Sequence, residues 1–125
     1  MDRGIGRRRW AIAEGYLPGW STGDRPELQS HETACMLNAG ERDAHVVLTC
    51  YFADREPAGP YTVVVPARRT RHLRFDELTE PAPIPRATDF AMLIESTEPI
   101  VVQHTRLDSR QAANALLSTI AFAAD

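Results

Sequence analysis

Short runs of alternating apolar and polar residues, each closed by proline, glycine or asparagine, recur along the sequence and leave little room for long helices. The clearest run covers residues 44–52, where one face of an extended strand would carry Val46, Leu48, Cys50 and Phe52. Comparable runs cover residues 10–16, 32–38, 61–65, 69–75, 90–96 and 100–106. The sequence therefore predicts an all-β fold, a β-sandwich of about seven to eight short antiparallel strands.

Proline also predicts where the strands end. Two loops, over residues 17–30 and 79–88, contain prolines and glycines that exclude regular structure. A shorter break at residues 97–99 separates the last two predicted strands, because Pro99 cannot donate a ladder hydrogen bond. We therefore expect residues 90–96 and 100–106 to form two strands joined by a turn.

The C-terminal residues follow a different period. Their apolar side chains recur at intervals of three and four, which is typical of an amphipathic helix: Ala112, Ala113, Leu116, Leu117, Ile120, Ala121 and Ala124. Asp108 and Gln111 have the spacing of a helix capping box. Ile120 and Phe122 would also suit a strand, which is the alternative. The periodicity favours a C-terminal helix over residues 109–123.

The composition is that of an ordinary globular chain. Its 125 residues suit one domain spanning residues 1–125, and its net charge of −3 gives no general attraction for nucleic acid or anionic membranes. No apolar run approaches membrane-spanning length, and no secretory signal follows the basic N-terminus. Cys35 and Cys50 both lie in apolar stretches and are expected to be buried free thiols. We therefore expect a soluble, cytoplasmic protein.

The sequence lacks the motifs of common enzyme classes. It contains no nucleophile elbow, no phosphate-binding loop and no dinucleotide fingerprint. It contains four histidines, but no two of them have the spacing of a metal-binding pair. We expect a protein that is not an enzyme and that needs neither a metal nor another cofactor.

One strand face suggests a polar site. Glu14 alternates with large apolar residues and would point inward, where a buried carboxylate needs a partner. His104 and Arg106 share a strand face and could supply one. The result could be a core ion pair, or a pocket with Trp10 or Trp20 in its wall that suits a sugar. The candidate ligand-binding residues are Trp10, Glu14, Trp20, Glu32, Asn38, His104 and Arg106.

A basic strip occupies residues 68–74. In a strand, Arg68, His72 and Arg74 would lie on one face, where they could bind phosphate or nucleic acid. The strip lacks the interleaved aromatic residues of single-strand binding proteins, and the chain is negative overall. A solvated face or a contact between subunits is the favoured interpretation, and we expect no specific nucleic-acid binding at physiological salt.

Several stretches resemble the sensory rhodopsin transducer family, in order along nearly the whole chain. They include WAIAEGY (10–16), SHET (30–33), LNAG (37–40), VPARRT (65–70), PAPIP (81–85), PIVVQHTRLDSRQ (99–111) and ALLSTIA (115–121). The resemblance implies a β-sandwich with a flexible C-terminal helix, assembled as a homotetramer. It implies either a soluble partner of a membrane photoreceptor or, as proposed for other members, an intracellular sensor of small molecules such as sugars.

The residues and the resemblance together lead to three functional hypotheses. The first is a cytoplasmic module that binds a sugar or a related metabolite. The alternative is a soluble transducer that binds a membrane sensory rhodopsin and relays its signal. A weaker alternative is a DNA-binding regulator that uses the basic strip.

Overall fold

The computed structural model describes residues 4–22, 26–111 and 113–124 of the chain. These residues form the strands β1 (Arg7–Tyr16), β2 (His31–Asn38), β3 (Ala44–Phe52), β4 (Ala58–Val65), β5 (Arg69–Arg74), β6 (Asp89–Asp108), β7 (Ala115–Ile120) and β8 (Phe122–Ala123). Two 3-10 helices of one turn each, η1 (Pro26–Leu28) and η2 (Phe75–Glu77), complete the regular structure. The prediction of an all-β antiparallel fold is confirmed.

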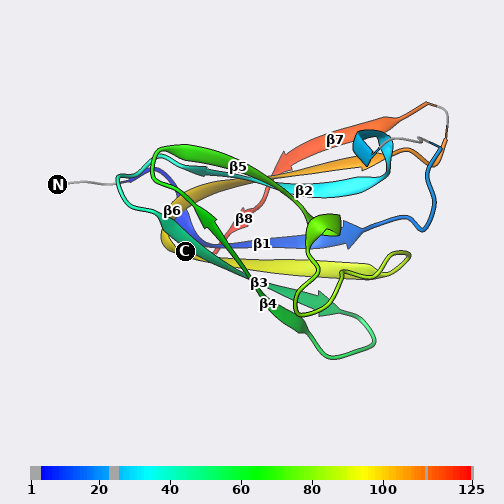
Figure 1. The fold of residues 1–125 in the computed structure, drawn as a ribbon, viewed down its shortest axis with the longest axis horizontal. Coiled ribbons are helices and arrows are strands. Elements are labelled where there is room, and N and C mark those ends of the chain that lie inside the picture. Colours follow the sequence, from blue (N-terminus) through cyan, green and yellow to red (C-terminus); the bar gives the residue numbers. More distant parts are fainter. Residues whose placement is uncertain (1–3, 23–25, 112, 125) are drawn as a thin grey trace.

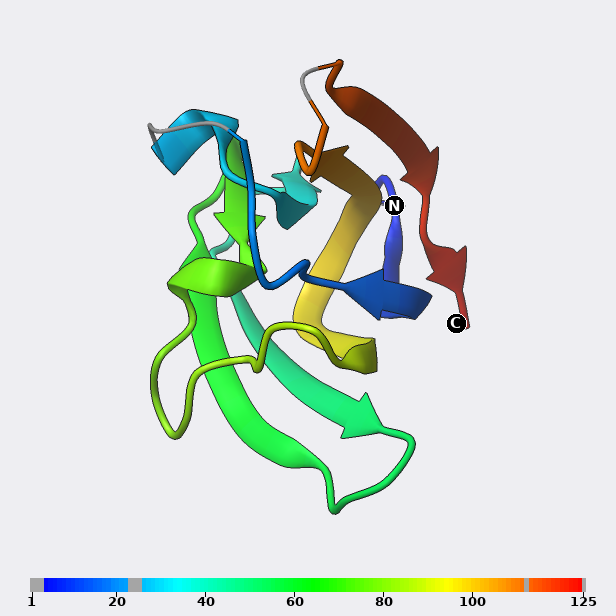
Figure 2. The same cartoon turned by 90° about the vertical axis from the view of Figure 1, so that its right-hand side faces the viewer.

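Strand β6 runs to one end of the molecule, bends there and runs back, and the other strands are organised around its two halves (Figure 1). Its first half lies between β3 and β1, and these two strands pair in turn with β4 and β8. Its second half lies between β2 and β7, and β5 extends the sheet beyond β2. Figure 2 shows the consequence: β4 and β5 (green) lie on one side of β6, and β7 and β8 (red) on the other.

β6 is one strand of 20 residues, so the prediction of two strands separated by a turn is wrong. Ser96 is the last residue that pairs with β3, and Val101 is the first that pairs with β2. Pro99 lies between these two ladders, where its missing N–H costs no strand-pairing hydrogen bond. The Thr97 hydroxyl accepts a hydrogen bond from the backbone N–H of His45 (2.9 Å). The proline therefore marks the change of partner strand and does not end β6.

The prediction of a C-terminal helix over residues 109–123 is also wrong, because this segment contains β7 and β8. β7 pairs with residues 103–108 of β6, and the backbone N–H of Ala124, just after β8, donates to Arg9 O of β1 (2.9 Å). The helical spacing misleads because β7 carries apolar side chains on both faces, and the open edge of β6 offers its backbone partners. Ala112 of the helical pattern lies outside the described residues.

Buried apolar side chains from β1 to β6 and from the segments that adjoin them form one core. In β3 the predicted alternation is confirmed: Val46, Leu48 and Cys50 are buried, whereas His45, Val47 and Tyr51 are exposed. Burial raises the pKa of the Cys50 thiol to about 11, which keeps it protonated at neutral pH. Cys35 is only half-buried, so the expectation of two buried thiols is correct for Cys50 alone.

A β-bulge in β1 decides which of its side chains face the core. Two residues, Ala13 and Glu14, oppose a single residue of β6 at this point. The alternation reverses there, so Gly15 is buried and Glu14 is exposed. A Cβ on Gly15 would lie 2.4 Å from the nearest ring atom of Phe90. The bulge and the glycine together let the Phe90 ring pack against β1.

We expect Gly15→Ala to lower the free energy of unfolding by about 1–3 kcal/mol, because the added methyl group would overlap the buried Phe90 ring. Gly19→Ala is the matched control, since its Cβ would meet only Ala87, at 3.8 Å. Chemical denaturation measures both variants. Equal stability of the two variants would contradict the close packing at the bulge, and Phe90→Leu should recover part of the Gly15→Ala loss.

Candidate functional site

A fully buried carboxylate joins β1, β2 and β6. Glu32 Oε1 accepts a hydrogen bond from His104 Nε2 (2.6 Å). Glu32 Oε2 accepts one from Arg106 Nε (3.0 Å) and another from the backbone N–H of Tyr16 (2.5 Å). The register explains the cluster, because Glu32 lies directly opposite Arg106, and His104 is two residues away on the same face of β6. The buried negative charge is therefore fully hydrogen-bonded and paired.

The two basic members of this cluster form one wall of an open pocket of about 270 Å³ between β1, β6 and the C-terminal strands. His104 and Arg106 line it, and Arg106 extends toward β1, where its Nη2 donates to Glu14 O (3.2 Å) and its Nη1 lies 3.9 Å from Glu14 Oε2. Leu117 of β7 and Phe122 of β8 supply an apolar wall. The three residues expected to share a pocket thus line the same one.

The expected inward direction of Glu14 is wrong. Its side chain is 88% exposed, because the bulge in β1 turns it outward to the rim of the pocket. Glu32 occupies the inward position instead. The available signal was its alternation with Ala34 and Met36 on β2, which are both buried. Periodicity alone cannot reveal a bulge, so the choice between the two carboxylates needed the tertiary structure.

Two further candidate residues, Trp10 and Asn38, are buried away from this pocket and have structural roles. Trp10 is buried in the core, and its Nε1 donates to Ile100 O (3.1 Å). Asn38 is fully buried, and its side-chain amide donates to Val65 O (3.0 Å) and accepts from the backbone N–H of Gly40 (3.0 Å). Asn38 therefore fastens the turn after β2 to the end of β4, and neither residue lines the pocket of Glu14.

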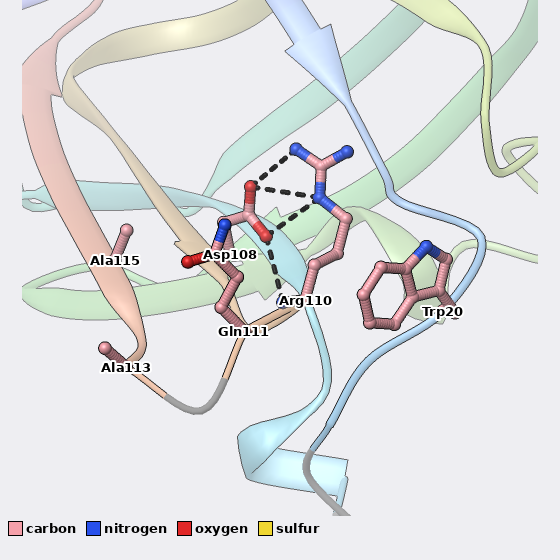
Figure 3. A pocket seen from close by; sticks show the side chains of 6 residues that line it. All are labelled: Trp20, Asp108, Arg110, Gln111, Ala113 and Ala115. Carbon is pink, nitrogen blue, oxygen red and sulfur yellow. Dashed lines mark hydrogen bonds and ion pairs between the residues drawn. The ribbon is translucent and has the colours of Figure 1, made fainter.

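Trp20 lines a second open pocket, of about 460 Å³, together with Asp108 and Arg110 (Figure 3). Asp108 holds the guanidinium of Arg110 through several hydrogen bonds, the shortest 2.7 Å, which lower the pKa of Asp108 and raise that of Arg110. The Thr22 hydroxyl donates to Ser109 O (2.7 Å) and so fixes the Trp20 loop beside these residues. Sequence reasoning missed Asp108 and Arg110 as site residues: Asp108 was predicted to be a helix cap, and Arg110 appeared only within the family-like stretch 99–111.

The predicted basic strip does not form one continuous face. Arg68 precedes β5 in the left-handed region (φ 58°) and lies 3.8 Å from a Glu41 oxygen. Arg74 is paired with Asp76 (2.7 Å). Burial opposes ionisation of Asp76, but the hydrogen bonds and charge of Arg74 outweigh it and lower the pKa of Asp76. Of the three residues predicted for the strip, Arg68 and Arg74 thus each lie near a carboxylate. In the described part of the chain, His72 is exposed and has no acidic partner.

The described side chains at both pockets offer hydrogen-bond donors, acceptors and apolar surface, which suit a polar organic ligand or a protein partner. Within residues 4–22, 26–111 and 113–124, no three His, Cys, Asp or Glu side chains lie close enough together to hold a metal ion. None of the helices in the described ranges is long and apolar enough to cross a membrane.

Comparison with known proteins gives one consistent family. The sequence matches the family model described as Anabaena sensory rhodopsin transducer over residues 5–123. A solved structure of Anabaena sensory rhodopsin transducer is 60% identical, covers 83% of this chain and 100% of its own, and has a TM-score of 0.76. The crystal structure of Thermotoga maritima 1070 is 32% identical, covers 95% of this chain and 96% of its own, and has a TM-score of 0.84. No curated protein matches the sequence.

We expect Glu32→Gln to lower the free energy of unfolding by about 3 kcal/mol, because Arg106 and His104 would lose the buried anion that they contact. Glu14→Gln is the matched control and should change stability by less than about 0.5 kcal/mol, since its carboxylate is exposed. Urea denaturation compares the two variants. Similar losses in both would mean that the Glu32 cluster does not stabilise the fold.

Proposed function

Because the chain belongs to the Anabaena sensory rhodopsin transducer family, we propose that it is a non-enzymatic signal transducer that binds a membrane photoreceptor from the cytoplasm. The observation that carries the proposal is the 60% identity to a protein named as such a transducer. The similarity favours this role over a sugar sensor, because the related structure is named for signal transduction from a sensory rhodopsin.

The C-terminal strands β7 and β8 supply a surface for such a partner. The exposed fractions of Leu116, Leu117, Ile120 and Phe122 are 72%, 53%, 60% and 70%. Residues 111–124 contain no charged side chain. Several large apolar side chains exposed close together on a small protein often mark an interaction site. We place the receptor contact on β7 and β8, where leaving these side chains in water is least favourable.

The homotetramer implied by the family resemblance belongs to this proposal. Four copies would present four equivalent sets of β7 and β8, and repeated contacts strengthen binding to a clustered receptor. Light scattering measures this assembly directly.

We expect the double substitution Ile120→Ser with Phe122→Ser to weaken binding to a sensory rhodopsin in lipid nanodiscs by at least about tenfold, because two exposed apolar contacts are lost. The matched control replaces Val47 and Tyr51 of β3 by serine, since these residues are also apolar and exposed. Surface plasmon resonance compares the variants.

Absence of binding by the unchanged protein at micromolar concentration would reject the receptor proposal. Equal weakening by the β3 control would reject the assignment to β7 and β8. Circular dichroism of each variant separates loss of binding from loss of the fold.

A small polar ligand is the second candidate function, and the two open pockets favour it. The first combines Glu14, His104 and Arg106 with apolar walls, and the second combines the Trp20 ring with the Asp108–Arg110 pair. Vicinal hydroxyl groups suit paired polar side chains, and the C–H face of a sugar suits an aromatic ring. A sugar or a related polyol is therefore the ligand class that we propose for these pockets.

We expect titration calorimetry with glucose, xylose and sorbitol to detect at least one ligand if this second function exists. Glu14→Gln should then weaken binding by about tenfold or more if the ligand occupies the first pocket, because a charged hydrogen bond is lost. Trp20→Ala should do so if it occupies the second. Millimolar sugar with no detectable heat, or affinities unchanged in both variants, would reject a sugar function for these pockets.

A further inference from the structure

Strand β5 leaves one backbone edge open. Among the described residues β5 pairs only with β2, so its other edge presents unpaired N–H and C=O groups. Arg69, Thr70, Arg71 and His72 are all exposed along it. β4 is also an edge strand, but it contains Pro60, which cannot donate, whereas residues 69–74 contain no proline. β5 is therefore a better edge than β4 for an added strand.

Two arginines on this edge have no acidic partner in the described part of the chain. Arg69 Nη1 donates to Arg68 O (3.0 Å), and Arg71 Nη1 reaches Val64 O (3.4 Å) across to β4. Both contacts are to backbone carbonyls, so the two positive charges are not neutralised by an ion pair. Arg74, at the other end of β5, contrasts with them because it is paired with Asp76. The open part of the edge is thus its positively charged part.

A hollow with several valines in its wall lies beside the same edge. An open pocket of about 490 Å³ is lined by Arg71 together with side chains of β3 and β4 that include Val47, Thr62 and Val64. Arg71 therefore lies between the open strand edge and an apolar surface. A ligand on this edge would meet backbone partners, positive charge and apolar surface together.

We propose that the open edge of β5 binds an extended acidic segment of a second protein, which adds to the sheet as a further strand. The segment would pair its backbone with β5, place carboxylates against Arg69 and Arg71, and place an apolar side chain in the adjacent hollow. Recognition of a peptide fits better than recognition of nucleic acid, since the edge matches a peptide backbone and carries no Phe, Tyr or Trp side chain for stacking bases.

This inference is independent of the proposed receptor contact. β5 and β7 are opposite edges of the part of the sheet ordered β5, β2, β6 and β7. Figure 2 shows them on opposite sides of β6. A protein partner on β5 therefore leaves β7 and β8 free, so the molecule could hold two partners at once.

The test uses a synthetic peptide of alternating valine and glutamate, with both ends blocked, and follows binding to the full chain by fluorescence anisotropy. We expect micromolar binding at low ionic strength that weakens as salt rises, because exposed charges are screened. The double variant Arg69→Gln with Arg71→Gln should lose at least about tenfold in affinity. The same peptide with a central proline should bind at least about tenfold more weakly, since it cannot complete the ladder.

Arg55→Gln is the matched control, because Arg55 is an exposed arginine in the loop between β3 and β4 and should leave peptide affinity unchanged. Absence of binding at low salt would overturn the proposal. The arginines would then be explained as charges that prevent two sheet edges from pairing and aggregating. Equal affinity for the proline peptide, or tighter binding of single-stranded DNA, would also overturn it in favour of a general polyanion surface. The Ile120 and Phe122 serine variant should bind the peptide normally.

Discussion

The backbone pairing of β6 is the constraint on which the rest of the structure depends. This one strand of 20 residues pairs with β3 and β1 along its first half and with β2 and β7 along its second. Every other strand is held to β6 directly or through one neighbour. Long-range pairing of this kind fixes the register of each strand, and the register in turn places the strand side chains of the candidate sites.

The buried Glu32 is a consequence of that register. Its carboxylate would be costly in the core without partners, and β6 supplies both His104 and Arg106 on the facing strand. Arg106 also contacts Glu14 at the pocket rim, so the same hydrogen bonds that stabilise the interior hold the polar wall of the pocket. Stability and the shape of this site are therefore linked through one cluster of charges.

The surface of the molecule divides into regions of different chemistry. The C-terminal strands are uncharged and expose large apolar side chains, whereas β5 exposes arginines beside an open backbone edge. These regions lie at opposite edges of the sheet, and the two polar pockets lie near the apolar side. Because of this separation, a ligand on one edge would not block the other.

The sequence by itself determined the all-β class, the alternation in β3, the grouping of His104 with Arg106 and the family. These are local properties, since alternation and residue spacing act along a single strand. Tertiary structure alone decided that Pro99 lies inside a continuous strand, that residues 115–123 pair as strands and that Glu32 replaces Glu14 in the interior. Each outcome depends on a partner strand distant in sequence. A gap between two ladders of β6 tolerates Pro99, the free edge of β6 pairs with a C-terminal segment whose sequence suits either helix or strand, and the bulge in β1 turns Glu14 outward.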